Sequence, residues 1–62
     1  MLTTREIEVL KLISQEYSSP EIARILNISQ STVDTYRKNL LKKTNVKNSV
    51  GLAMYAVKNK IV

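Results

Sequence analysis

The sequence predicts an all-α fold built from four short helices over residues 1–62. A helix-start pattern, an apolar residue followed by Ser or Thr and then by an acidic residue or Thr, occurs three times. Asn, which accepts the left-handed conformation that ends many helices, follows two of the apolar stretches. No Gly- or Pro-rich linker or low-complexity segment divides the chain, so we expect one compact domain.

The first helix is predicted over residues 3–16. Thr3 can accept a hydrogen bond from the free N–H groups of the first turn, while Glu6 reaches back to the backbone of Thr3. Leu2 can pack on Ile7 across this start. The three features together form a complete helix N-terminus.

The second helix is predicted over residues 18–27. Ser18 and Glu21 repeat the arrangement of the first helix. Pro20 is tolerated because the first turn has no use for its missing N–H. Asn27 is suited to the left-handed position at the end.

The third helix is predicted over residues 29–44, between Ser29 as N-cap and Asn45 as the left-handed stop. Its start is weaker, because Thr32 stands where the first two helices have Glu. Only about three residues separate it from the second helix. Two short helices with so tight a turn are typical of a helix-turn-helix, although an ordinary αα-hairpin without a nucleic-acid role has the same spacing.

One face of the third helix is expected to be polar and exposed. At about 100° per residue, Val33, Leu40 and Thr44 share one side, which we expect to face the core. The opposite side gathers short hydroxyls and cations, namely Ser31, Thr35, Lys38 and Lys42. Ser, Thr and Lys can bond base edges, so this face suits a helix that enters the major groove of DNA. The alternative is a face that is simply solvated.

Asp34 is the exception on this helix, because DNA phosphates repel a carboxylate unless it is paired or accepts from cytosine N4. Lys38 lies four residues later, so we expect an intrahelical ion pair worth a few tenths of a kcal/mol, with a part in base choice as the alternative. The N–H groups and dipole of the helix start favour a phosphate near residues 29–32.

The charge distribution points to a polyanionic partner. The net charge is +5, and residues 30–62 hold seven bases and one acid, whereas residues 1–29 hold three bases and four acids. Nucleic acid or an anionic membrane surface would fit this asymmetry, as would a merely lysine-rich solvated surface. A membrane fits less well, since the cationic face of the third helix lacks bulky apolar neighbours.

The composition excludes several classes of function. The chain has no Cys and no His, which excludes disulfides and thiolate metal sites and removes the usual proton shuttle. No nucleophile is paired with a base, so we expect neither enzyme activity nor a metal or cofactor. Without a signal-peptide pattern or an apolar run of about 20 residues, the expected location is cytoplasmic.

The fourth helix is predicted over residues 48–59, with Asn48 as N-cap. One side carries Leu52, Tyr55 and Ala56, which suit the core. A second apolar stripe lies roughly opposite and consists of Val50, Met54, Val57 and Ile61. So small a domain has little protein to cover both sides. We therefore expect a symmetric dimer contact there, with packing against the first helix as the alternative.

Residues 3–10, Thr-Thr-Arg-Glu-Ile-Glu-Val-Leu, resemble the T-x-R-E-x-E-V-L opening of the LuxR-type helix-turn-helix domain. Further motifs of that family are matched by residues 21–23, residues 26–29, residues 31–33, Leu40, Lys43, Val46, Leu52 and residues 55–56. The resemblance spans nearly all of the chain without a gap. It is therefore far more specific than any single motif.

The resemblance implies a DNA-binding domain of a bacterial transcription regulator, with double-stranded DNA and a second copy of the chain as partners. It implies base reading from Asp34, Thr35 and Lys38, to which the polar face of the helix adds Ser31, and phosphate contacts from Ser29, Gln30, Thr32 and Lys42. The last helix commonly forms the dimer contact in the family. The domain also commonly follows a phosphate-receiver or ligand-sensing domain, so we expect such an N-terminal domain outside this chain.

The departures from the family pattern limit what can be transferred. Asp34 stands where a basic residue is frequent, so the family's base preferences do not carry over. Tyr36 and Thr44 stand where His and Leu are usual. Gly51 replaces an acid or amide, which should weaken the start of the last helix by up to about 1 kcal/mol.

Two other functions remain as alternatives. A promoter-reading domain of a sigma factor shares the R-E-x-E-V-L opening, but Val46 and the last helix fit the LuxR type better. A protein-interaction module would use the apolar stripe of the last helix without binding DNA. The basic half of the chain and the hydroxyl–lysine face argue against it.

Overall fold

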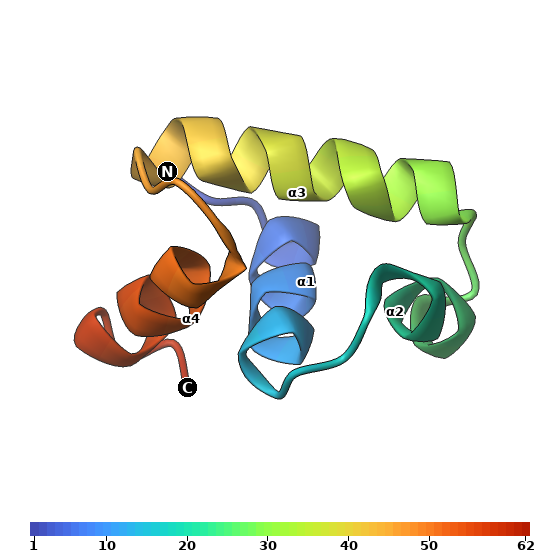
Figure 1. Ribbon diagram of the computed structural model, residues 1–62, viewed down its shortest axis with the longest axis horizontal. Helices are drawn as coiled ribbons and strands as arrows, with labels where there is room; N and C mark the ends of the chain where they lie inside the picture. The colour runs from blue at the N-terminus through green and yellow to red at the C-terminus, as the bar shows by residue number, and fades with distance from the viewer.

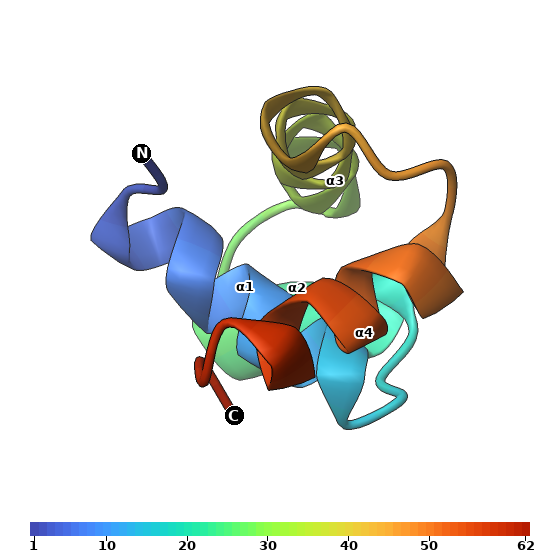
Figure 2. The same cartoon turned by 90° about the vertical axis from the view of Figure 1, so that its left-hand side faces the viewer.

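The computed structural model describes all 62 residues and contains four helices and no strand, as the sequence predicts. The helices are α1 (Thr4–Ser14), α2 (Ser19–Leu26), α3 (Gln30–Thr44) and α4 (Ser49–Lys58). The longest helix, α3, lies across one side of the molecule, and α1 lies beneath it between α2 and α4 (Figure 1). Seen end-on, α3 stands apart above the other helices (Figure 2). One side of α3 is therefore free of the rest of the protein.

The first two helix starts are the reciprocal caps that the sequence predicts. In α1 the Thr3 hydroxyl accepts from the Glu6 N–H at 3.2 Å, and the Thr3 N–H donates to Glu6 Oε1 at 2.8 Å. In α2 Ser18 and Glu21 make the same two hydrogen bonds at 3.3 and 2.9 Å. Each pair occupies backbone groups that a helix start otherwise leaves without partners.

The end of α1 differs from the expected boundary, because the helix stops at Ser14 and not at residue 16. Glu16 adopts a left-handed conformation, with φ 69°. The Tyr17 N–H donates back to the Leu12 carbonyl at 3.2 Å, and the Glu16 N–H to the Ile13 carbonyl at 3.0 Å. This Schellman turn occupies the last carbonyls and reverses the chain. No Gly or Asn lies at this turn, so the helix-end pattern did not predict it.

The same kind of turn ends α2 and α4. Asn27 has φ 57°, and the Ile28 N–H donates to the Ala23 carbonyl at 3.0 Å. Lys60 also has φ 57°, and the Ile61 N–H donates to the Ala56 carbonyl at 2.8 Å. The left-handed conformation predicted for Asn27 is confirmed, as is that of Asn45 at the end of α3, with φ 58°. Lys60 was not predicted to adopt it.

The core receives side chains from all four helices. Its buried apolar members are Val9, Leu10, Ile13, Ile22, Ala23, Val33, Leu40, Leu52 and Ala56. The inward face predicted for α3 is thus confirmed for Val33 and Leu40, both with no exposed surface. Thr44 is half-buried on the same side, where its hydroxyl donates to the Leu40 carbonyl at 2.7 Å. The Thr44 hydroxyl therefore has a hydrogen-bond partner in a position where an apolar side chain would have needed none.

The two apolar sides of α4 differ in solvent exposure. Leu52 and Ala56 are buried, whereas Val50, Met54 and Val57 keep 69%, 68% and 64% of their surface exposed. The alternative, in which part of the stripe packs inward, holds for Ile61 alone, because Ile61 packs against a core that includes residues of α1. Ile61 does not continue their stripe, because α4 ends at Lys58 and the left-handed turn folds Ile61 back against the core.

The start of α4 lies unusually close to the chain that leaves α3. A Cβ atom placed on Gly51 would lie 3.0 Å from the Cβ of Val46, which is tighter than ordinary contact. The Gly51 N–H also donates to the Asn48 side chain at 3.0 Å, which completes the predicted cap. None of the four helices combines the length and the apolar character needed to cross a membrane.

Candidate nucleic-acid interface

Residues 19–44 form a helix-turn-helix in which α2 supports α3. The connection consists of Asn27, Ile28 and Ser29, and Ile28 is packed against the core. The turn is therefore fixed by a left-handed residue, a buried side chain and an N-cap in succession. This turn holds α3 against α2, and the other side of α3 faces outward (Figure 1).

The structure brings the predicted polar residues of α3 to this outward side. Ser31, Thr35, Lys38 and Lys42 are all exposed. The Thr35 hydroxyl donates to the Ser31 carbonyl at 3.1 Å, so its proton is already engaged. Thr35 therefore presents a methyl group and a hydroxyl acceptor to solvent, while Lys38 and Lys42 present donors. No large apolar side chain lies among them.

The N-terminus of α3 carries a cluster of hydroxyl groups. The Ser29 hydroxyl accepts from the Thr32 N–H at 3.1 Å and lies 2.7 Å from the Thr32 hydroxyl and 3.2 Å from that of Ser31. Thr32 thus bonds the cap side chain, in contrast to the Glu residues of α1 and α2, which bond the cap backbone. The N–H groups of Gln30 and Ser31 have no acceptor in the protein, so they are available to an anion.

Asp34 lies exposed on the same helix and makes neither a hydrogen bond nor an ion pair. The predicted pair with Lys38 is therefore wrong. An exposed pair at this spacing gains only a few tenths of a kcal/mol, which the loss of side-chain freedom can offset. The carboxylate is left unpaired on a helix that otherwise carries cations.

Two other cations of α3 are held by the protein itself. Lys43 Nζ donates at 2.9 Å to Glu6 Oε1, a carboxylate whose side chain is only 4% exposed. The Thr3 N–H and then the Lys43 ammonium, acting as donors, lower the pKa of Glu6 below its ordinary value. Arg37 donates to the Ser49 hydroxyl at the start of α4. Sequence reasoning missed both contacts, because each joins residues far apart in the chain.

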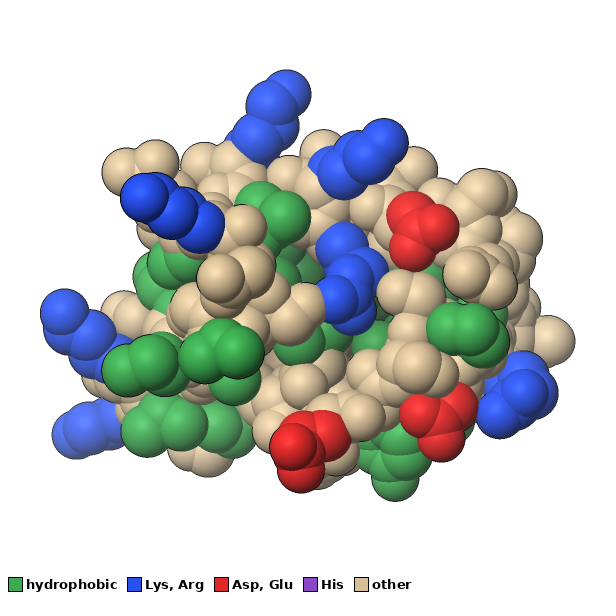
Figure 3. Space-filling model, viewed as in Figure 1, with side chains coloured by type: hydrophobic (Ala, Val, Ile, Leu, Met, Phe, Trp, Pro, Cys, Tyr) green, Lys and Arg blue, Asp and Glu red, His purple; other side chains and the backbone are tan.

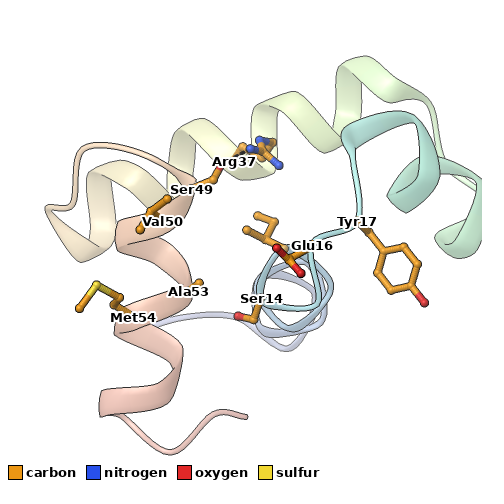
Figure 4. Close-up of a pocket in the computed structure, with 9 residues that line it drawn as sticks. Ser14, Glu16, Tyr17, Arg37, Ser49, Val50, Ala53 and Met54 are labelled. Carbon is orange, nitrogen blue, oxygen red and sulfur yellow. Dashed lines mark hydrogen bonds between the residues drawn. The ribbon is translucent and has the colours of Figure 1, made fainter.

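A pocket of about 450 Å³ lies under Arg37, between α4 and the end of α1. Figure 4 shows Ser49 and Ala53 on one side of it, Ser14 and Glu16 on the other, and Arg37 above. Tyr17 points away from it (Figure 4). The lining pairs no nucleophile with a base, and this pocket lies apart from the outward side of α3.

The surface charge follows the arrangement of the helices. Lys and Arg side chains project along the edge formed by α3 and also at the lower left and lower right, while acidic side chains lie at the lower side and beside the right-hand part of that edge (Figure 3). Of the seven bases in residues 30–62, Lys38 and Lys42 lie on the outward side of α3, whereas Lys58 and Lys60 lie in and after α4. A positive edge of this kind attracts a polyanion over long range at low salt.

The fold and this surface define a helix-turn-helix protein of the DNA-binding class. The chain belongs to the family of bacterial regulatory proteins described as the luxR family, which it matches over residues 1–56. The family expected from the sequence motifs is therefore confirmed, and the sigma-factor alternative is set aside. The chain is a DNA-binding domain of bacterial transcription regulation.

Several bacterial regulators are similar to this chain. The transcriptional regulatory protein MctR of Rhizobium johnstonii is 44% identical over 61 residues, which cover 98% of this chain and 28% of that protein. The oxygen regulatory protein NreC of Staphylococcus carnosus is 37% identical over 62 residues, covering 100% and 29%. The nitrate/nitrite response regulator protein NarP of Escherichia coli is 46% identical over 50 residues, covering 81% and 23%. The chain thus spans less than a third of the length of these relatives.

Proposed function

We propose that this domain binds double-stranded DNA in a sequence-dependent manner by placing α3 in the major groove. The observation that carries the proposal is the division of α3 into two sides. Val33 and Leu40 are fully buried on one, and the outward side holds only polar side chains. An α-helix fits the major groove, where hydroxyl and ammonium groups can bond base edges.

Within this arrangement the residues have separate roles. Lys38, in the middle of the outward side, is the donor for guanine O6 and N7. The free N–H groups at Gln30 and Ser31, the hydroxyls of Ser29 and Thr32, and the Lys42 ammonium bind phosphates. Lys43 has no part in this, because Glu6 already holds it.

The domain binds as a homodimer through α4. The exposed stripe of Val50, Met54 and Val57 is self-complementary in character, and a two-fold axis would bury it against its own copy. Two copies of α3 would then meet half-sites about one helical turn apart. Ile61 is left out of this contact, because it is partly buried against the core.

The full protein is proposed to be a cytoplasmic response regulator in which this domain follows a receiver or sensor domain. The support is the share of the relatives that the chain covers, together with the name of one of them, a response regulator protein. Its signal would be received by that other domain, whereas its target sites would be read by α3 of this chain.

An amide chemical-shift titration tests the placement of α3. The labelled domain is mixed at low salt with a duplex of about 20 base pairs, which is long enough for two half-sites. We expect shifts to cluster on residues 29–42. Lys38→Glu should abolish the specific part of binding without changing the helical circular-dichroism spectrum. Lys11→Glu, the same charge reversal at an exposed position of α1, should bind nearly as before.

Two results would contradict the proposal. The first is the absence of DNA-dependent shifts at roughly 100 µM protein, where even non-specific binding should be visible. The second is a set of shifts confined to α4 that grows with protein concentration alone. That second result would support the protein-interaction alternative, for which the exposed α4 stripe is the only evidence.

A further inference from the structure

The outward side of α3 presents acceptors in its N-terminal half and donors further along. Asp34 is exposed with both carboxylate oxygens unbonded, and Thr35 turns its hydroxyl proton back to the Ser31 carbonyl. Lys38 follows one turn later with a free ammonium group. A base that meets the first half of this side must therefore supply donors, and a base that meets Lys38 must supply acceptors.

The cations close to Asp34 in the sequence do not satisfy it. Lys38 makes no ion pair with it, and Arg37 is turned to Ser49 on the side of α4. Lys43 is bound to Glu6. The carboxylate therefore meets DNA with its acceptor sites unfilled, and it needs a donor there to offset repulsion from the phosphates.

The four bases differ in what they offer a carboxylate in the major groove. Cytosine presents the N4 amino donor without an acceptor of its own. Adenine sets its N6 donor beside the N7 acceptor, guanine presents two acceptors, and thymine presents one acceptor and a methyl group. A carboxylate is thus matched by cytosine and repelled by guanine.

We propose that Asp34 is a specificity-determining residue that selects cytosine at one position of each half-site by accepting a hydrogen bond from N4. This rests on the proposed binding of α3 in the major groove. Asp34 and Lys38 are four residues apart, which is about 6 Å along the helix, or within two base-pair steps. The half-site therefore contains a cytosine for Asp34 close to a guanine for Lys38.

The test is a selection of binding sites from randomised duplexes, followed by titration of duplexes that differ in one base pair. The variants are Asp34→Asn and, as the matched control, Glu16→Gln. Each removes one negative charge and keeps the side-chain shape, and Glu16 lies in the turn after α1, away from the outward side of α3. Circular dichroism checks that each variant is folded.

We expect the wild-type domain to favour cytosine at one position by roughly 5- to 100-fold over guanine. Asp34→Asn should move that preference to adenine, whose N6 and N7 pair with an amide, and should bind random duplex more tightly. Glu16→Gln should keep cytosine. If Asp34→Asn selects the same sites as the wild type, Asp34 does not read a base, although the major-groove proposal stands. Failure of the wild type to bind any duplex at low salt overturns both proposals.

Discussion

Glu6 shows how one side chain can serve two elements. Its carboxylate closes the capping box of α1 and also binds Lys43 of α3 while nearly all of its own surface is buried. The local spacing from Thr3 predicts the first contact. The second contact joins residues that are 37 positions apart in the sequence, so local spacing cannot predict it and it forms only in the folded chain. The N-terminus of α1 is thereby fastened to the C-terminal half of α3.

Stability should depend on the charge of Glu6. Its pKa is lowered in the folded state, so the contribution to stability is complete above the ordinary value of 4.5 and is lost as the pH falls through the lowered value. Glu6→Gln keeps an amide that can still cap but loses the ion pair. We expect a loss of about 1 kcal/mol at neutral pH, or roughly 5–8 °C in Tm.

The measurement is thermal unfolding between pH 7 and pH 3. The Tm of Glu6→Gln should approach that of the wild type at the acid end. Glu8→Gln is the control, because it removes only the exposed pair with Arg5 and should change stability by a few tenths of a kcal/mol. A constant difference between Glu6→Gln and wild type across this range would show that the ionised carboxylate is not what stabilises the fold.

At the level of the helices, three of the four end in a Schellman turn without glycine. Glu16, Asn27 and Lys60 all hold positive φ values. For a side chain other than Asn or Asp, this conformation costs about 1–2 kcal/mol relative to the right-handed one. The turns at Glu16 and Lys60 are therefore strained, and the turn at Asn27 much less so.

Replacing the strained residues should stabilise the domain. Glu16→Gly and Lys60→Gly should each raise the free energy of unfolding by about 1 kcal/mol, after allowing for the greater freedom of glycine in the unfolded chain. Asn27→Gly should change it by less than about 0.5 kcal/mol. Urea denaturation measures all three, and an equal gain at Asn27 would show that conformational strain is not the cause.

These turns also explain which boundaries the sequence predicts well. All four starts follow from a cap side chain that accepts from the N–H three residues later, so they can be predicted from the local sequence. The stop of α1 depends on Glu16 entering a conformation that its residue type disfavours. The hydrogen bonds of the turn, from the Glu16 and Tyr17 N–H groups to the Ile13 and Leu12 carbonyls, accompany that conformation, and no local sequence pattern predicts it.

In the candidate site, too, some features can be predicted from the local sequence and others cannot. The outward side of α3 follows from the helical period, because burial of Val33 and Leu40 fixes which way Lys38 faces. The ion pair expected between Asp34 and Lys38 does not follow from spacing, since so weak an interaction does not determine a side-chain position. Ile61 was misplaced because its position depends on where α4 ends.

Considered as a whole, the molecule has two exposed surfaces of opposite character on neighbouring helices. The outward side of α3 is polar and basic, and the outward side of α4 is apolar. Arg37 and Ser49 join the two helices directly. Contact between two copies at α4 would therefore also set the relative placement of two α3 helices.

Met54→Glu tests this arrangement, because Met54 lies between Val50 and Val57 and is 68% exposed. The domain should stay folded. Affinity for a duplex with two half-sites should fall by roughly 10- to 100-fold, since the benefit of joint binding is lost, while affinity for a single half-site should hardly change. Met54→Leu, which keeps the surface apolar, should behave as wild type. Equal losses on both duplexes would contradict a dimer through α4.

Gly51 affects how α4 sits relative to the rest of the domain. The helix α4 can approach Val46 closely because position 51 has no side chain. A side chain at this position would require Val46 to shift or α4 to sit at a different tilt. In the proposed dimer, such a tilt changes the distance between the two reading helices. Position 51 would then affect which spacing of half-sites the domain accepts, although the proposal assigns it no contact with DNA.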